Sequence, residues 1–195
     1  MVVAALGDSI TAGSPCWDPD PSVRDRIGPA LDERSQWEYW ASEADPRLGF
    51  RNCGIHGQRT DEIAKRLEEC ANGAELLVVQ GGINDIAQMQ PVTSAAANLR
   101  GMVRRGHEMG LRMALADVLP WNGGWPRMEE PIRRLNGLIH AIAEKENASL
   151  LRFHDTLADP SRPGRMPDDW TSDGDHPSVE GYRRLGKLVA GALSP

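Results

Sequence analysis

The sequence of 195 residues has few cysteines, few aromatic residues and no long apolar run. No window approaches the ~18 to 20 uninterrupted apolar residues of a transmembrane helix. The opening MVVAALGDS lacks the basic start and the apolar length of a signal peptide. Cys16, Cys53 and Cys70 are odd in number and form no CxxC pair, so they predict neither a disulfide framework nor a zinc site. These absences favour a reduced, cytoplasmic compartment, while a secreted chain that has already lost its signal peptide would look the same.

Positive charge is also in deficit, because 28 acidic residues face 22 basic ones and the net charge is −6. This balance argues against nucleic acid or an anionic membrane as a partner, since both attract basic patches. The apolar fraction of 40% and the charged fraction of 26% are those of an ordinary globular protein. The length predicts one domain over residues 1–195.

Short apolar segments alternate with helical periodicity along the whole chain. Three segments are nearly pure apolar runs, as strands covered on both faces are: Val2–Leu6, Leu76–Val79 and Met113–Ala116. Two more contain polar residues and read as edge strands: Phe50–Cys53 and Leu150–Phe153. Apolar residues at helical spacing predict helices in five places: near 36–44, from Thr60 through Leu67, near 94–109, over 132–142 and over 182–189. Thr60, which is followed by two acidic residues, is the expected N-cap of the second helix.

Five strands alternating with helices predict an α/β fold, a three-layer α/β/α sandwich around a five-stranded parallel sheet. Placing the polar strands at the edges gives the flavodoxin-like order 2-1-3-4-5. Ligands of such sheets bind at the carboxyl ends of the strands, at the switch point between strands 1 and 3. The residues that follow strands 1, 2 and 3 are therefore the candidates for a functional site.

Four sequence blocks place reactive groups at that edge. Ser9 follows strand 1 within Gly7-Asp8-Ser9, and a serine nucleophile needs a base that is itself oriented by a third group. The glycines of Gly54-Ile55-His56-Gly57 and the amide of Asn84, which follow strands 2 and 3, offer hydrogen-bond donors to an oxyanion. Asp173 and His176, three residues apart near the C-terminus, can form a carboxylate–imidazole pair.

With these four blocks in this order, the chain resembles the SGNH hydrolases, the GDSL family of serine esterases and lipases. The resemblance implies that Ser9 is the nucleophile, His176 its base and Asp173 the group that orients the base. It also implies an oxyanion hole made by the N–H groups of Ser9 and Gly57 and the side chain of Asn84. No metal and no organic cofactor is implied.

Several residues compete with these assignments or depart from the family pattern. His56 stands where the family often has serine, and it is a rival base as well as a candidate ligand contact. Asp175 is a rival to Asp173 as the orienting group. Asp8 and Asp85 could form a carboxylate pair for acid–base work, whereas the resemblance implies that they are hydrogen-bonding supports. The remaining histidines are expected to be solvated or at the edge of the core: His107, His140 and His154.

The segment 169–180 resembles a calcium-binding EF-hand loop. Five of its residues fall at ligand or glycine positions of that motif: Asp169, Thr171, Asp173, Gly174 and Glu180. His176 replaces the usual apolar residue, Pro177 follows it, and prolines upstream exclude the entering helix. Calcium binding is therefore not expected.

Six of the ten aromatic residues are tryptophans, and they fall into two groups. Trp37 and Trp40 share a predicted helix with Ala41 and Ala44 and are expected in the core. Four others lie in loops at the edge that bears Ser9: Trp17, Trp121, Trp125 and Trp170. Their rings can stack on a sugar, line a small acyl pocket, or hold their own loops in place.

The predicted function is that of a serine esterase for small acyl groups, acting on a small-molecule or carbohydrate ester, with an O-acetylated carbohydrate as one candidate. A thioesterase or a lysophospholipase-type lipolytic enzyme of the same family is the alternative. Two readings from other classes are a non-catalytic carbohydrate-binding protein and a flavodoxin-like cofactor-binding module. The first has no use for Ser9, Asp173 and His176 together, and the second conflicts with the negative charge of Asp8 after strand 1.

Overall fold

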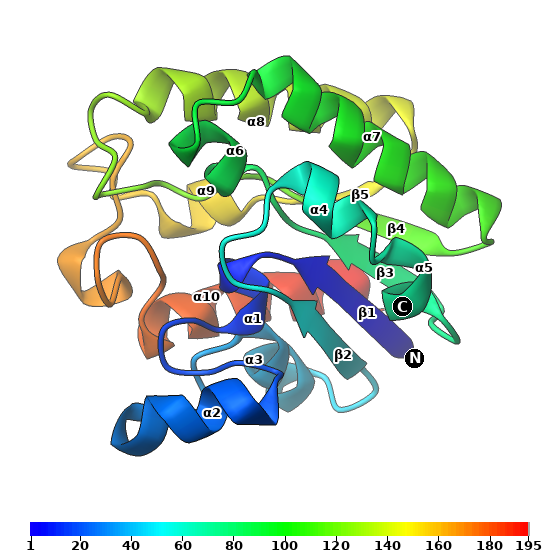
Figure 1. Ribbon diagram of the computed structural model, residues 1–195, viewed down its shortest axis with the longest axis horizontal. Coiled ribbons are helices and arrows are strands. Elements are labelled where there is room, and N and C mark those ends of the chain that lie inside the picture. Colours follow the sequence, from blue (N-terminus) through cyan, green and yellow to red (C-terminus); the bar gives the residue numbers. More distant parts are fainter. Residues whose placement is uncertain (195) are drawn as a thin grey trace.

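The computed structural model describes residues 1–194 and contains one parallel sheet in the order β2-β1-β3-β4-β5 (Figure 1). Its strands are β1 (Val2–Gly7), β2 (Gly49–Gly54), β3 (Leu76–Val79), β4 (Arg112–Ala116) and β5 (Ser149–Leu151). The predicted fold class and strand order are confirmed. The polar strands β2 and β5 lie at the edges, where one side of a strand meets solvent instead of a neighbouring strand.

Helices cover both faces of this sheet (Figure 1). One face packs against α4 (Thr60–Ala64), α5 (Leu67–Ala71), α6 (Ile83–Ala87), α7 (Val92–Glu108) and α8 (Glu129–Lys145). The other packs against α1 (Ser9–Ala12), α3 (Trp37–Ala44), α9 (Phe153–Leu157) and α10 (Val179–Leu193). Helix α2 (Pro21–Ile27) and the 3-10 turn Gly28–Ala30 have no buried residue, and the 3-10 turn Asp168–Trp170 packs against the second core through Trp170.

Strand β1 shows why the sheet needs two helical layers. Its side chains alternate, so Ala4 and Leu6 enter one apolar core and Val3 and Ala5 enter the other. All four are fully buried. A strand buried on both faces reads as an unbroken apolar run, which is why the sequence identified it.

The long helices follow the predicted periodicity. Four residues of α8 at spacings of three and four are buried: Ile132, Leu135, Ile139 and Ile142. In α10 the Ser178 side chain caps the first turn, and Tyr182, Leu185 and Val189 face the core. A Cβ on Gly186 would collide with the backbone of α3, so this glycine lets α10 and α3 pack closely.

Two expectations about element boundaries were wrong. The helix predicted from Thr60 through Leu67 is two short helices, α4 and α5, and its N-cap is Arg59. The Thr60 hydroxyl does not cap the helix: it donates to the carboxylate of Asp85 and accepts a hydrogen bond from the Asn98 amide. Phe153 does not end strand β5 but begins α9, where its ring is fully buried.

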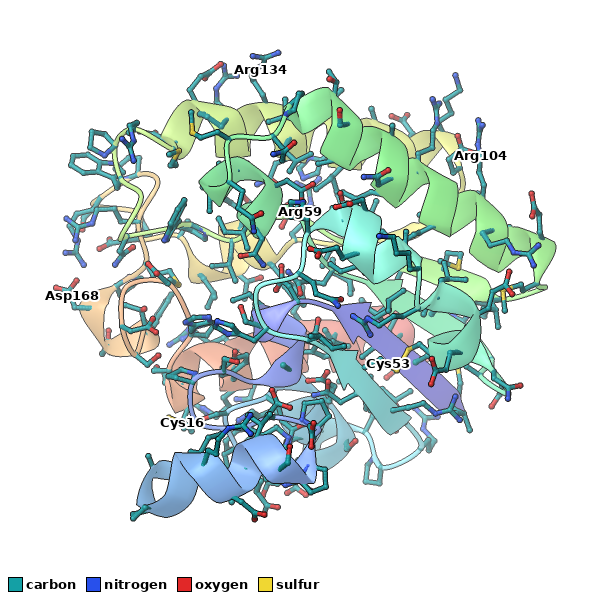
Figure 2. The ribbon with its side chains drawn as sticks, in the orientation of Figure 1. Cys16, Cys53, Arg59, Arg104, Arg134 and Asp168 are labelled. Atoms are coloured by element: carbon teal, nitrogen blue, oxygen red, sulfur yellow. A yellow bond between two sulfur atoms is a disulfide. The ribbon has the colours of Figure 1, made fainter. Side chains whose placement is uncertain are left out.

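The expectation of no disulfide was also wrong, because Cys53 and Cys70 are bonded. The bond joins β2 to α5, and Figure 2 shows Cys53 on β2 with Cys16 lying apart from it beside α2. The two partners are 17 residues apart, a spacing with no recognisable motif, and only the turn of the chain through α4 and α5 brings them together. The expectation of a reduced compartment therefore loses the support that unpaired cysteines gave it.

The prediction that Trp37 and Trp40 both lie in the core is correct for Trp37 alone. Trp37 is fully buried, whereas Trp40 is partly exposed and donates its indole N–H to the carbonyl of Arg34. Ala44 is exposed at the end of α3. Across residues 1–194, none of the helices combines the length and the apolar character that crossing a membrane requires.

Candidate active site

Ser9 lies directly after the central strand β1, as the first residue of α1. The Asp8 carboxylate fixes this turn by accepting a hydrogen bond of 2.9 Å from the backbone N–H of Ile10. A Cβ on Gly7 would collide with the side chains of Thr11 and Gln80, so only glycine fits before the turn. Ser9 is 5% exposed, which places its hydroxyl at the floor of the site rather than on an open surface.

The Ser9 hydroxyl belongs to a continuous chain of hydrogen bonds. It donates to Nε2 of His176 over 3.0 Å, and Nδ1 of the same ring donates to Oδ2 of Asp173 over 2.8 Å. The other oxygen of Asp173 accepts the backbone N–H groups of Asp175 and His176. Ser9 and Asp173 therefore hold the two nitrogens of the His176 ring and fix both its position and its orientation.

The charge of Asp173 is stabilised where it stands. Burial raises the pKa of this carboxyl, but the hydrogen bonds from His176 and from the backbone outweigh it and hold the pKa below its ordinary value. An ionised carboxylate on Nδ1 keeps Nε2 free to accept a proton from a serine.

The rival residues have other partners. Asp175 accepts a hydrogen bond from the indole N–H of Trp121. His56 is exposed, lies 3.4 Å from the hydroxyl of Ser14 and stacks on the His176 ring, with 5.8 Å between ring centroids. The imidazole that contacts Ser9 is that of His176.

The candidate oxyanion donors lie at the same edge of the sheet, because β2 and β3 flank β1. Gly57 has a φ of 79°, a left-handed conformation that favours glycine in the turn after β2. The Asn84 amide donates one N–H to the carbonyl of Gln58 over 3.0 Å, which leaves its second N–H for another acceptor. Asp85 anchors the same turn by accepting the N–H and the hydroxyl of Thr60.

Asp8 is a buried support with a raised pKa. One oxygen binds Ile10, whereas Oδ2 is buried with no hydrogen-bond partner among residues 1–194. Burial raises the pKa of this carboxyl to about 6, against the lowering effect of its hydrogen bonds. Burial likewise raises the pKa of Asp85 above its ordinary value, despite the bonds from Thr60.

The other histidines lie away from Ser9. Nε2 of His140 is 2.8 Å from the buried carboxylate of Asp117, and Nε2 of His107 is 2.8 Å from the carbonyl of Glu146. His154 lies beside Asp155 at the start of α9. Within residues 1–194, no group of three or more His, Cys, Asp or Glu side chains is placed to hold a metal ion.

Each of the four loop tryptophans contacts a neighbouring polar side chain. Guanidinium groups lie over three of the rings: Arg24 over Trp17 at 4.9 Å, Arg165 over Trp125 at 5.6 Å and Arg184 over Trp170 at 3.7 Å. The fourth, Trp121, donates to Asp175 and so ties the loop after β4 to the loop that carries His176. These contacts favour the role of holding loops in place, and substrate contact stays a prediction.

Sequence reasoning missed Gln80, which follows β3. Its side-chain oxygen accepts the hydroxyl of Thr11 over 2.9 Å and the N–H of Asp8 over 3.3 Å, so β3 supports the turn that holds Ser9. The only sequence signal for this role is that Gln80 is a polar residue directly after the apolar strand Leu76–Val79. The glycines that follow it are equally typical of an ordinary turn.

A serine hydroxyl bonded to an imidazole that a carboxylate holds, at the carboxyl edge of a parallel sheet, is the arrangement of a serine hydrolase. A family model described as GDSL-like Lipase/Acylhydrolase family matches residues 5–184, and the chain belongs to this family. The protein is accordingly an ester-hydrolysing enzyme of the lipase and esterase kind.

Solved structures of other proteins share the fold. One from Desulfitobacterium hafniense DCB-2, assigned to the lipolytic G-D-S-L family, has 20% identity and a TM-score of 0.81, covering 98% of this chain and 99% of its own. A G-D-S-L family member from Veillonella parvula DSM 2008 has 18% identity and a TM-score of 0.79, covering 100% and 98%. An acetyl xylan esterase mutant from Geobacillus stearothermophilus has 19% identity and a TM-score of 0.74, covering 99% and 94%. No curated protein matches the chain in sequence.

Proposed function

We propose that this protein is a serine esterase that hydrolyses carboxylic esters with small acyl groups through an acyl-enzyme intermediate. The observation that carries the proposal is the unbroken hydrogen-bond chain from Asp173 through His176 to Ser9. Asp173 acts through His176 and is a positioning residue, whereas Ser9 and His176 contact the reacting atoms.

The reaction proceeds in two steps. Nε2 of His176 takes the proton of Ser9 as the hydroxyl attacks the ester carbonyl, and the resulting oxyanion is met by the N–H groups of Ser9 and Gly57 and by the Asn84 amide. The proton on His176 then passes to the alcohol oxygen, the C–O bond breaks and an acyl group remains on Ser9. Water, activated by the same imidazole, hydrolyses that acyl-enzyme and restores the free serine.

Two features support a small acyl group. The segment beside Ser9 contains α2, whose sequence PSVRDRI has only two large apolar residues and none buried, so it lacks the apolar face of a lipase lid. A related fold is found in an acetyl xylan esterase, which extends the candidate substrates to O-acetylated carbohydrates.

A panel of p-nitrophenyl esters from acetate to palmitate, extended with an acyl thioester and acetylated xylan, tests the proposal. We expect kcat/KM to be highest for acetate and butyrate and to fall steeply for longer chains. A value that rises toward palmitate indicates a lipase instead, and a preference for the thioester indicates a thioesterase. Ser9→Ala is the matched control, because activity that survives this change at the wild-type level does not depend on the Ser9 nucleophile.

A further inference from the structure

A groove with a volume of about 930 Å³ lies along the open edge of β2, beside the candidate site. Helices α2 and α5 lie on either side of that strand (Figure 1). The bonded pair Cys53 and Cys70 forms part of its wall, so the disulfide fixes the spacing between β2 and α5 there. The reaction described above uses none of these groups.

His56 connects this groove to the reacting groups. Its exposed ring lines the groove and also stacks on His176, with an interplanar angle of 29°. A substrate group that extends past His176 on the side of His56 therefore contacts the His56 ring, and beyond that ring it enters the groove.

The stereochemistry of ester hydrolysis determines which part of the substrate points that way. The oxyanion faces Gly57 and Asn84, whereas the alcohol oxygen has to lie within reach of Nε2 of His176, because that imidazole returns the proton to it. The alcohol side of the ester thus lies on the His176 side of the reacting carbon. From there His56 leads into the groove.

The lining of the groove indicates the chemistry of that alcohol. Three arginines and three acidic residues contribute to it, so their charges balance and do not select an anion such as a phosphorylated headgroup: Arg26, Arg51 and Arg66 with Asp18, Asp20 and Glu69. Asn72 adds an amide that can both donate and accept hydrogen bonds, whereas the Asn52 amide is engaged with the backbone of Thr11 and Gly54. Donors and acceptors beside apolar surface suit a neutral chain of many hydroxyl groups.

Some of these groups serve the fold and others face the groove. Arg66 is engaged with Gln58 and two backbone carbonyls, and Arg51 donates to the carbonyls of Cys70 and Asn72. The Arg26 side chain, by contrast, forms no hydrogen bond or ion pair with residues 1–194, so its donors are available to a ligand.

We propose that this groove binds the alcohol part of the substrate and that this part is a neutral oligosaccharide. The inference rests on the proposed esterase function. It assigns carbohydrate binding to the edge of β2, and it leaves the loop tryptophans to hold their own loops.

Val23→Trp tests the groove, because Val23 lines it from α2 and a larger ring there fills its space. The control is Ala97→Trp, which adds the same ring to an exposed site on α7. The substrates are p-nitrophenyl acetate, whose leaving group is too short to extend along the groove, and partially acetylated xylo-, manno- and cello-oligosaccharides.

We expect Val23→Trp to lower kcat/KM for the oligosaccharides about tenfold more than for p-nitrophenyl acetate, mostly through KM. Ala97→Trp is expected to keep the wild-type ratio of the two. A Val23→Trp variant with the wild-type ratio overturns the groove proposal, as does a wild type that hydrolyses p-nitrophenyl acetate but none of the oligosaccharides. A wild type with no activity on any ester overturns the esterase function itself, so the two failures are distinguishable.

Discussion

Asp8 combines a structural task with a burial penalty. Its carboxylate holds the turn that presents Ser9, yet it is fully buried and its second oxygen has no partner within residues 1–194. Desolvation accordingly raises the pKa to about 6 from an ordinary value of 3.8. The folded protein therefore keeps a proton on Asp8 at pH values where the unfolded chain has lost it.

This linkage predicts a pH dependence of stability. Because the folded state binds the extra proton, the Asp8 contribution to the free energy of unfolding is fully present below about pH 4 and is lost as the pH rises to about 6. The difference in pKa corresponds to roughly 3 kcal/mol. Asp8→Asn keeps an oxygen for the N–H of Ile10 and removes the titration. Urea denaturation at pH 4, 5, 6 and 7 is expected to show a shallower fall for the variant, and parallel curves would refute this account of Asp8.

Asn84 is assigned to the developing negative charge. Asn84→Ala is expected to lower kcat for an acetyl ester by about 10²- to 10³-fold with little change in KM, because the lost donor acts in the transition state. Asn84→Asp, which keeps the size, removes the amide donor and places a negative charge beside the oxyanion, should lose at least that factor. Since Asn84 also holds the carbonyl of Gln58, circular dichroism and melting curves check that both variants are folded. Wild-type kcat in either variant contradicts the assignment.

At the scale of elements, the strands and long helices were the predictable part. The apolar run Leu76–Val79 and the apolar stripe from Ile132 to Ile142 reflect burial alone. Buried positions recur at the spacing of a strand or a helix, so the apolar residues of the sequence show them directly. The short elements depend on contacts made by residues far apart in the chain. Thr60 is a residue type common at N-caps, but its hydroxyl is engaged by Asp85 and Asn98, which are 25 and 38 residues later, and the N-cap is Arg59.

The disulfide between β2 and α5 is a second long-range contact with a measurable effect. Replacing Cys53 and Cys70 together by alanine removes a constraint on a 17-residue separation and is expected to lower the free energy of unfolding by about 3 kcal/mol. Urea denaturation of the two proteins measures the difference. Alkylation of the unfolded, unreduced wild type should modify one thiol, that of Cys16. Three modified thiols would show that the bond is absent.

At the scale of the whole molecule, the order of the strands is what made the site predictable. Ser9, Gly57 and Asn84 are each residue types that are common in turns. The strand order 2-1-3-4-5 is what brings the ends of strands 1, 2 and 3 together. Asp173 and His176 could be paired from their spacing, and the structure places that pair on Ser9.

The remainder could not be read from the sequence because it depends on side-chain partners. Nothing in the sequence indicates that Gln80 supports the Ser9 turn or that Trp121 binds Asp175. Nor does it indicate the groove along β2, which exists because α2 and α5 stand apart on either side of that strand. The same is true of the loop tryptophans, whose neighbouring arginines come from other parts of the chain.

The central claim is that Ser9 is the nucleophile, and covalent labelling with a fluorophosphonate followed by peptide mass spectrometry tests it most directly. An activated serine attacks phosphorus and keeps the adduct, whereas an ordinary surface serine does not react. The account predicts one adduct per chain, located on Ser9 within the tryptic peptide Met1–Arg24, and no adduct on folded Ser9→Ala. An unmodified Ser9 in the wild type, or an equal adduct on Ser9→Ala, would contradict it.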